Sequence, residues 1–278
     1  MLSVLTLNIW GLPGVGPLGM APKKKERIQG ICRELKRSAA ENHGWDIVLL
    51  QEVWLQEDRN VLARCGYPLS VDLNDSKLWL DSGLLILSKY PVQKMHRLTY
   101  PALPISPDVL EDGEALVKKS AVLVQVEHPL AGPLWVGNTH LISYYAEGEA
   151  DQYQERRKQQ FSSFAQWAKQ LARDQPLIVG GDWNFGEHNP DLWAEKNQLL
   201  PDFVVSSEAA LQSTLSSENT FQEKDQGRVD HLFASAHFQA ERGELAMHRR
   251  LKGPEGEFNL SDHFGWSEIY SLKVSPSP

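Results

Sequence analysis

Residues 177–184 read Leu-Ile-Val-Gly-Gly-Asp-Trp-Asn, and this stretch decides how we expect the chain to fold. An apolar run of strand length leads into two glycines, which let the backbone approach a neighbour closely. Residues two apart in an extended segment face the same side, so Asp182 and Asn184 address one point. An Asx-turn closing a strand would explain one of these polar residues, but it explains the pair less well. We therefore expect a buried strand that ends at a functional site.

The same arrangement, an apolar run with polar residues at its end, recurs along the chain. Polar side chains follow several of these runs, among them Asn8, Glu52 and His140. From apolar content and length we expect strands at 2–7, 45–50, 83–87, 121–126, 134–136, 177–179, 229–233 and 264–269.

Two segments between these runs carry apolar residues at helical spacing. One covers about 23–41 and the other 150–171. Fully apolar strands that alternate with helices predict sheets covered by helices. We expect one α/β domain over residues 1–278, with two stacked sheets and helices outside them. Periodicity alone does not distinguish this arrangement from a doubly wound sheet.

Composition limits the classes of function. The chain has 278 residues, of which 41% are hydrophobic and 23% charged, as in an ordinary soluble protein. Its formal net charge of -8 disfavours a general nucleic-acid binder, because an acidic surface repels phosphate backbones. No apolar run approaches the roughly 20 residues of a membrane span. The first residues read as a strand and not as a signal peptide. We expect a soluble protein, and the sequence does not decide between a cytoplasmic, a peripheral membrane and a secreted location.

The two cysteines, Cys32 and Cys65, are far apart and belong to no Cys/His cluster. A structural zinc site is therefore not expected. The pair could form a single disulfide, but we expect two free thiols in helical segments.

Glu52 and Asn8 are candidate ligands for a metal ion. A carboxylate at the end of an apolar strand is costly to desolvate unless it is paired or bound to metal. Taken alone, Glu52 could be a surface acid and Asn8 a turn residue. If their strands are neighbours, however, the two side chains converge. Magnesium binds few carboxylates, keeps several waters and takes the substrate phosphate as a ligand. One glutamate with an asparagine amide oxygen fits that preference.

Two histidines lie where proton transfer could be needed. His140 comes at the end of a strand-like run and His263 follows Asp262. A histidine whose pKa is near neutrality can deprotonate a water and assist a leaving group. Asp230 is a candidate to orient one imidazole, or else it pairs with Arg228.

Lys119 precedes the run at 121–126, where it is either a phosphate contact or solvated charge flanking a strand. Trp10 and the loop at 12–20 are either a packed loop or a wedge for a lipid surface.

Together these motifs resemble those of the endonuclease/exonuclease/phosphatase superfamily, which is also called DNase I-like. The motifs are Asn8, Gln51-Glu52, Thr139-His140-Leu141, Gly181-Asp182-x-Asn184, Arg228-x-Asp230 and Ser261-Asp262-His263. The resemblance spans nearly the whole chain. It implies a four-layer α/β sandwich, in which two stacked sheets with mixed and mostly antiparallel strands are flanked by helices. It also implies a divalent cation, usually Mg²⁺, with Mn²⁺ as the alternative.

Three stretches narrow the resemblance. The start Asn8-x-Trp10-Gly11-Leu12-Pro13 looks like that of neutral sphingomyelinases, and Glu52-Val53-Trp54 is similar to their glutamate motif. Thr139-His140-Leu141 looks like their His-Leu motif. Lys119 lines up with a lysine that this family carries at a comparable place.

The resemblance implies a role for each site residue. Glu52 binds Mg²⁺, with Asn8 assisting and Asp262 near the metal. Asp182 and Asn184 handle the attacking water and the phosphate.

The same resemblance makes His263 the general base, with Asp230 orienting a ring. It implies that His140 contacts the phosphate or assists the leaving alkoxide, and that Lys119 contacts the phosphate. Spacing alone leaves open which histidine is base and which is acid.

The implied reaction is phospholipase C cleavage of sphingomyelin or a related choline phospholipid, which releases ceramide and phosphocholine. We expect a monomer that acts on phospholipid at a membrane surface without a transmembrane segment. The alternative is a metal-dependent endonuclease or DNA-end-processing phosphodiesterase of the same superfamily, and the acidic net charge argues against nucleic acid.

Overall fold

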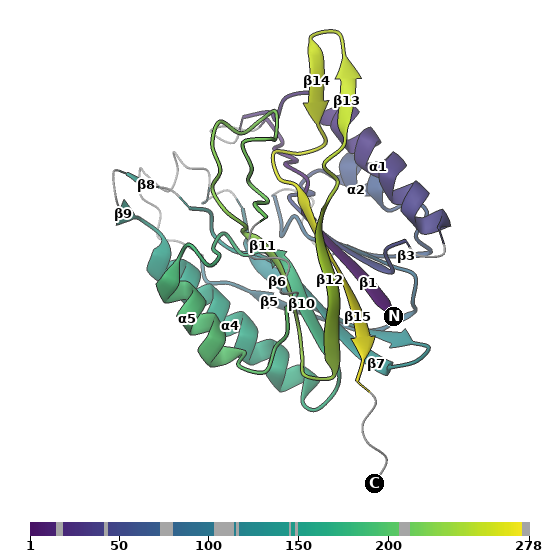
Figure 1. Ribbon diagram of the computed structural model, residues 1–278, viewed down its shortest axis with the longest axis vertical. Helices are drawn as coiled ribbons and strands as arrows, with labels where there is room; N and C mark the ends of the chain where they lie inside the picture. Colours follow the sequence, from purple (N-terminus) through teal and green to yellow (C-terminus); the bar gives the residue numbers. More distant parts are fainter. Residues whose placement is uncertain are drawn as a thin grey trace.

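The centre of the molecule consists of two β-sheets (Figure 1). The computed structural model describes residues 1–14, 19–41, 44–72, 80–102, 114, 117–144, 146–147, 150–205 and 212–273. The six-stranded sheet has the order β12 (Phe238–Ala246), β15 (Gly265–Leu272), β1 (Leu2–Asn8), β2 (Ile47–Gln51), β4 (Leu85–Ser88), β3 (Leu69–Asp72). The five-stranded sheet has the order β11 (Asp230–Ala234), β10 (Leu177–Asp182), β7 (Gly132–His140), β6 (Ser120–His128), β5 (Val92–Thr99). Both sheets are mixed, since β1–β2 and β7–β10 are parallel pairs and the other pairs are antiparallel.

Helices cover the outer faces of the two sheets. In Figure 1, α1 (Lys24–Ala40) and α2 (Gln56–Leu62) lie on one side of the sheets, and α4 (Gln154–Ala172) and α5 (Pro190–Leu199) lie on the other. Buried aliphatic side chains from both sheets, such as Leu49 and Val136, fill the space between them. Separate apolar clusters join each sheet to its helices. The molecule is thus a four-layer α/β sandwich, as the resemblance predicts, and not a doubly wound single sheet.

The apolar runs gave the strands correctly and the helices nearly so. All eight expected strands are present, because their side chains are buried on one or both faces. The expected helix at 23–41 is α1. The expected helix at 150–171 begins later, because Ala150–Asp151 is β9 and pairs with β8 (Ala146–Glu147).

Other elements were not predicted, because their sequences contain no apolar run. The edge strand β5 is largely exposed. β13 (Arg250–Gly253) and β14 (Gly256–Asn259) form a charged hairpin, which projects at the top of Figure 1. Among the helices in the described ranges, none combines the length and the hydropathy needed to cross a bilayer.

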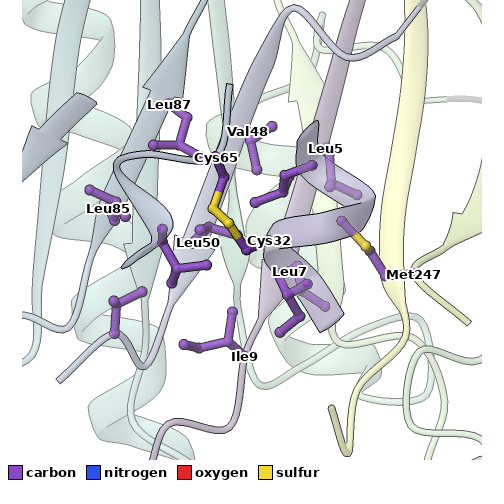
Figure 2. Close-up of a cluster of buried hydrophobic side chains, with 14 of the residues drawn as sticks. Leu5, Leu7, Ile9, Cys32, Val48, Leu50, Cys65, Leu85, Leu87 and Met247 are labelled. Atoms are coloured by element: carbon purple, nitrogen blue, oxygen red, sulfur yellow. A yellow bond between two sulfur atoms is a disulfide. The ribbon is translucent and has the colours of Figure 1, made fainter. Parts of the chain in front are cut away.

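The expectation of two free thiols was wrong. Cys32 on α1 and Cys65, which follows α2, form a disulfide with a Cα–Cα distance of 5.1 Å. Figure 2 shows this bond among the buried side chains between the helices and the six-stranded sheet, including Val48 and Leu50. The pairing depends on how α2 packs against α1. Residues 33 positions apart gave no sequence signal of that packing.

Candidate active site

Strand register brings the polar ends of the strands together. The parallel β1–β2 pair places Asn8 opposite Gln51, next to Glu52. The parallel β7–β10 pair places His140 opposite Asp182. The antiparallel β10–β11 pair then places Asp182 opposite Asp230. Residues from both sheets therefore meet at one end of the sandwich.

Asn8 links two carboxylates across the sheets. Its side-chain amide nitrogen donates to Glu52 Oε1 at 3.0 Å and to Asp182 Oδ2 at 2.9 Å. Its side-chain oxygen accepts the backbone N–H of Trp10 at 2.9 Å. The amide nitrogen of Asn8 therefore faces the carboxylates. The sequence had predicted that the amide oxygen would face the site as a metal ligand. The Ser261 hydroxyl donates to the Asn8 backbone carbonyl at 2.7 Å and so attaches the segment that carries Asp262.

The backbone around the site adopts unusual conformations. Trp10, Glu52 and Asn184 have φ values of 50°, 59° and 52°, in the left-handed region that non-glycine residues rarely occupy. The next residue, Gly11, has to be a glycine, because a Cβ there would lie 2.1 Å from the Glu52 backbone oxygen. Gly181 has φ 143° and touches β7 in the same way, since a Cβ would lie 2.0 Å from the Thr139 oxygen. Both glycines are required by close backbone contacts at the site.

His263 and Asp230 form a buried acid–imidazole pair. Nδ1 of His263 lies 2.8 Å from Asp230 Oδ2, and its Nε2 lies 3.9 Å from Asp182 Oδ2. Burial alone would lower the pKa of His263, but the carboxylates of Asp230 and Asp262 outweigh burial and raise this pKa well above its usual value. Burial and the Asp230 carboxylate raise the pKa of Asp182. Asp182, Asp230 and His263 thus form one compact, buried group of side chains.

Lys119 and His140 form the opposite side of the site. Lys119 Nζ lies 2.8 Å from His140 Nε2, donates to the Leu141 carbonyl at 3.1 Å and lies 3.8 Å from Glu114 Oε1. Burial and the Lys119 ammonium lower the pKa of His140 well below its usual value. Because an ammonium can only donate, Nε2 of the neutral ring accepts, and the ring proton is on Nδ1. Nδ1 makes no hydrogen bond to any described residue.

Asn184 shares the Leu141 carbonyl with Lys119 and also lines an open cavity. Its side-chain amide donates to the Leu141 carbonyl at 3.0 Å, and its backbone N–H donates to Asp182 Oδ1 at 3.0 Å. The cavity has a volume of about 400 Å³. Its lining includes Tyr144, His188 and the polar loop residues 224–226. A substrate group attached to a phosphate at Asn184 has room there.

The carboxylates fit a divalent cation. Glu52 Oε2 is buried without a hydrogen-bond partner among the described residues. Burial and the Asp262 carboxylate raise the pKa of Glu52 to about 7, which means that the negative charge lacks compensation. Asp262 also has a raised pKa, chiefly from burial. An unpartnered oxygen beside further carboxylates suits Mg²⁺, which prefers oxygen ligands.

A second group of ligating atoms lies within 4.8 Å of one another and belongs to Asp182, Asp230 and His263. Nitrogen is a poorer ligand for Mg²⁺ than oxygen, and His263 Nδ1 is already paired with Asp230. We therefore favour Glu52 and Asp262 as the metal ligands.

The structure gathers all the expected site residues at this one end. Lys119 is buried, whereas its neighbour Lys118 is exposed. Sequence reasoning missed Glu114 beside Lys119 and the buried Arg27, whose charge acts on Asp262 and Glu52. Neither residue stands in a recognisable motif, so no signal pointed to them. Of the loop at 12–20, residues 15–18 lie outside the described part, and Met20 is exposed.

Known proteins are similar to this chain in sequence. The model of the Endonuclease/Exonuclease/phosphatase family matches residues 5–263. The inositol phosphosphingolipids phospholipase C of Schizosaccharomyces pombe is 26% identical and is covered over 70% of its length by 100% of this chain. The putative neutral sphingomyelinase of Drosophila melanogaster is 28% identical, and 94% of this chain covers 59% of it.

A solved structure has the same fold. The crystal structure of a mutant beta toxin from Staphylococcus aureus with bound magnesium ions superposes with a TM-score of 0.70 at 17% identity. The superposition covers 96% of this chain and 98% of the toxin chain.

Proposed function

The chain belongs to the endonuclease/exonuclease/phosphatase family, and we propose that it is a Mg²⁺-dependent phosphodiesterase of the phospholipase C type. Its substrate is sphingomyelin or a related choline phospholipid. We further propose that residues 1–278 form a single catalytic domain that acts as a monomer at a lipid surface. The observation that carries the proposal is the juxtaposition of two groups. One is the buried His263–Asp230 pair, and the other is the carboxylate group that Asn8 joins.

His263 takes the proton from the attacking water. The Asp230 carboxylate accepts a hydrogen bond from Nδ1–H, holds the ring in one tautomer and stabilises the imidazolium that forms. Nε2 then faces Asp182, whose carboxylate helps to hold the water. The 2.8 Å contact between His263 and Asp230 supports His263 as the base, and the contact of His140 with Lys119 supports a role for His140 at the phosphate.

Glu52 and Asp262 would hold the cation, and Asn8 orients the Glu52 carboxylate. A Mg²⁺ ion bound there would polarise a phosphoryl oxygen and offset the charge that grows on it. Mn²⁺ has the same preference for oxygen ligands and is expected to substitute.

Lys119, His140 and Asn184 receive the phosphate on the other side. The Lys119 ammonium supplies positive charge in a buried place, where it is screened little. The Nδ1–H of neutral His140 has no partner among the described residues and would donate to a phosphoryl or leaving oxygen. Preorganised donors of this kind stabilise developing negative charge without needing to reorganise.

The similarity to known proteins supports the proposal of a lipid substrate. Both curated relatives are named for sphingolipid cleavage, and this chain spans 70% and 59% of their lengths. The Asn8-x-Trp10-Gly11 start agrees with that substrate class. The net charge of -8 weighs against a phosphate polymer.

The deciding experiment measures phosphocholine release from sphingomyelin vesicles with Mg²⁺ and with EDTA, beside a plasmid-nicking assay. His263→Ala is the test variant, and His96→Ala, on the exposed strand β5, is the matched control. We expect Mg²⁺-dependent release that His263→Ala abolishes and His96→Ala retains, with the plasmid intact. Nicking without release would reject the lipid substrate in favour of a nuclease.

A further inference from the structure

Three arginines are buried almost completely, and each lies on a different helix. Arg27 on α1, Arg59 on α2 and Arg157 on α4 are 0%, 1% and 0% exposed. Burying a guanidinium is costly unless hydrogen bonds replace those to water. The hydrogen-bond partners of these three side chains therefore indicate why the side chains are buried.

Arg27 holds the loop that follows Asn8. Its guanidinium donates to the carbonyls of Ile9 at 2.8 Å and Trp10 at 2.8 Å, the first two residues after β1. It also donates to the carbonyl of Leu260 at 3.2 Å, just before the Ser261-Asp262-His263 segment. One side chain thus joins the two segments that carry Asn8 and Asp262.

Arg59 and Arg157 each bind the segment that follows one further strand. Arg59 Nε donates at 2.7 Å to the carbonyl of Val53, which follows Glu52. Arg157 donates at 2.9 Å and 2.8 Å to the carbonyls of Ile142 and Ser143, shortly after His140.

Two of the loops that these arginines bind contain strained backbone. Trp10 and Glu52 have left-handed φ values, and such conformations persist only where the surroundings enforce them. A guanidinium presents several donors in one rigid plane, so it can fix two or three carbonyls relative to one another. The Cys32–Cys65 disulfide additionally joins α1 to the end of α2, the two helices that carry Arg27 and Arg59 (Figure 2).

We propose that Arg27, Arg59 and Arg157 are positioning residues, each of which fixes the backbone after one strand of the active site. Arg27 and Arg59 position the carboxylates that hold the metal. Arg157 positions the segment whose Leu141 carbonyl anchors Lys119 and Asn184, on the phosphate side. The inference rests on the part of the proposed function that concerns the metal and the phosphate. It does not depend on the lipid substrate.

A lysine replacement separates positioning from mere stability, because it keeps the charge and loses the planar set of donors. The variants are Arg27→Lys, Arg59→Lys and Arg157→Lys in the full chain. Phe238→Leu is the control, since Phe238 packs on Tyr270 at the far end of β1 from Asn8. Calorimetry measures the binding of Mg²⁺ alone, and then of inorganic phosphate at saturating Mg²⁺, well below each unfolding temperature.

We expect Arg27→Lys and Arg59→Lys to weaken Mg²⁺ binding about tenfold or more, as losses of groups that support metal ligands do. Arg157→Lys keeps Mg²⁺ binding within about twofold and weakens phosphate binding about fivefold, the equivalent of one lost hydrogen bond. Phe238→Leu changes neither affinity. For Arg27→Ala, added guanidinium ion should restore part of the Mg²⁺ affinity.

Affinities in the three lysine variants equal to those of Phe238→Leu would overturn the inference and leave the proposed function standing. A wild-type protein that binds no Mg²⁺ would overturn both. If Arg27→Ala does not fold, the lysine variants still decide the outcome.

Discussion

His263 Nδ1 lies 2.8 Å from Asp230 Oδ2, and Asp230 is fully buried. The pair joins the loop before β15 to the first residue of β11, so it connects the two sheets at the site. An imidazole held in this way has one nitrogen committed to the carboxylate and the other directed toward the substrate. In the proposed mechanism this pair supplies the base, and the activity should therefore depend on pH.

Asp230→Asn should shift the pH profile and slow the reaction. The Asp230 carboxylate is the main cause that raises the pKa of His263 against the effect of burial. A base works when it is deprotonated, so the acid limb of the profile follows this pKa. Removing the charge lowers the pKa and moves the limb to lower pH. Turnover should fall roughly 10²- to 10⁴-fold, because the amide does not hold the required tautomer.

The measurement is turnover from pH 5 to 9, with the exposed Asp202→Asn as control. An acid limb at the same pH in Asp230→Asn and in the wild-type protein would contradict the assignment.

Glu52→Gln should change how the stability of the metal-free protein depends on pH. The pKa of Glu52 is raised to about 7, so the folded state binds this proton more tightly than the unfolded state does. The contribution is favourable at acid pH and is lost as the pH rises from about 4.5 through about 7. Its size is at most about 3 kcal/mol.

Thermal unfolding in EDTA at pH 5 and pH 8 tests this. The wild-type protein should lose more stability over that interval than Glu52→Gln, and Mg²⁺ at pH 8 should restore it only in the wild-type protein. Equal losses in the two proteins, or equal recovery with Mg²⁺, would count against Glu52 as the metal ligand.

Lys119→Met should lower turnover about 10- to 100-fold, because it removes a buried positive charge from the phosphate side. The ammonium also contributes to the low pKa of His140, so that pKa should rise. Steady-state kinetics give the turnover, and the NMR titration of the ring gives the pKa. Lys118→Met is the matched control, since that neighbour is exposed. Similar losses in the two variants would show that the effect is general electrostatics.

Removal of the disulfide should destabilise the fold. The bond joins residues 33 positions apart, and the loop-closure argument assigns a bond of this span about 3–4 kcal/mol. Urea unfolding of a Cys32→Ser/Cys65→Ser double variant should show this loss, and reduction of the wild-type protein should reproduce it. A double variant as stable as the oxidised wild-type protein would mean that packing alone holds α2 against α1 (Figure 2).

Elements that bury an apolar face could be predicted from the sequence, and the rest could not. The run at 177–179 is buried on both sides in β10, so its residues had to be aliphatic. β5 is an exposed edge strand whose residues carry no such requirement. Asn8, Glu52 and His140 were visible because each of these polar side chains stands at the end of a strand or directly after it.

Partnerships across the chain were not visible. The sequence left Asp230 to orient one imidazole or to pair with Arg228, and only the folded chain places it against His263. The bond between Cys32 and Cys65 depends on helix packing. The carbonyls that Arg27 binds leave no trace in a sequence pattern, since any residue supplies a carbonyl.

Hydrolysis of sphingomyelin in ¹⁸O-labelled water, with Mg²⁺ present, tests the central claim most directly. Attack at phosphorus by a water that His263 deprotonates places one ¹⁸O atom on the released phosphocholine and none on ceramide. The label should disappear with EDTA and in His263→Ala. Release of choline in place of phosphocholine, label in ceramide, or undiminished release by His263→Ala would contradict the account.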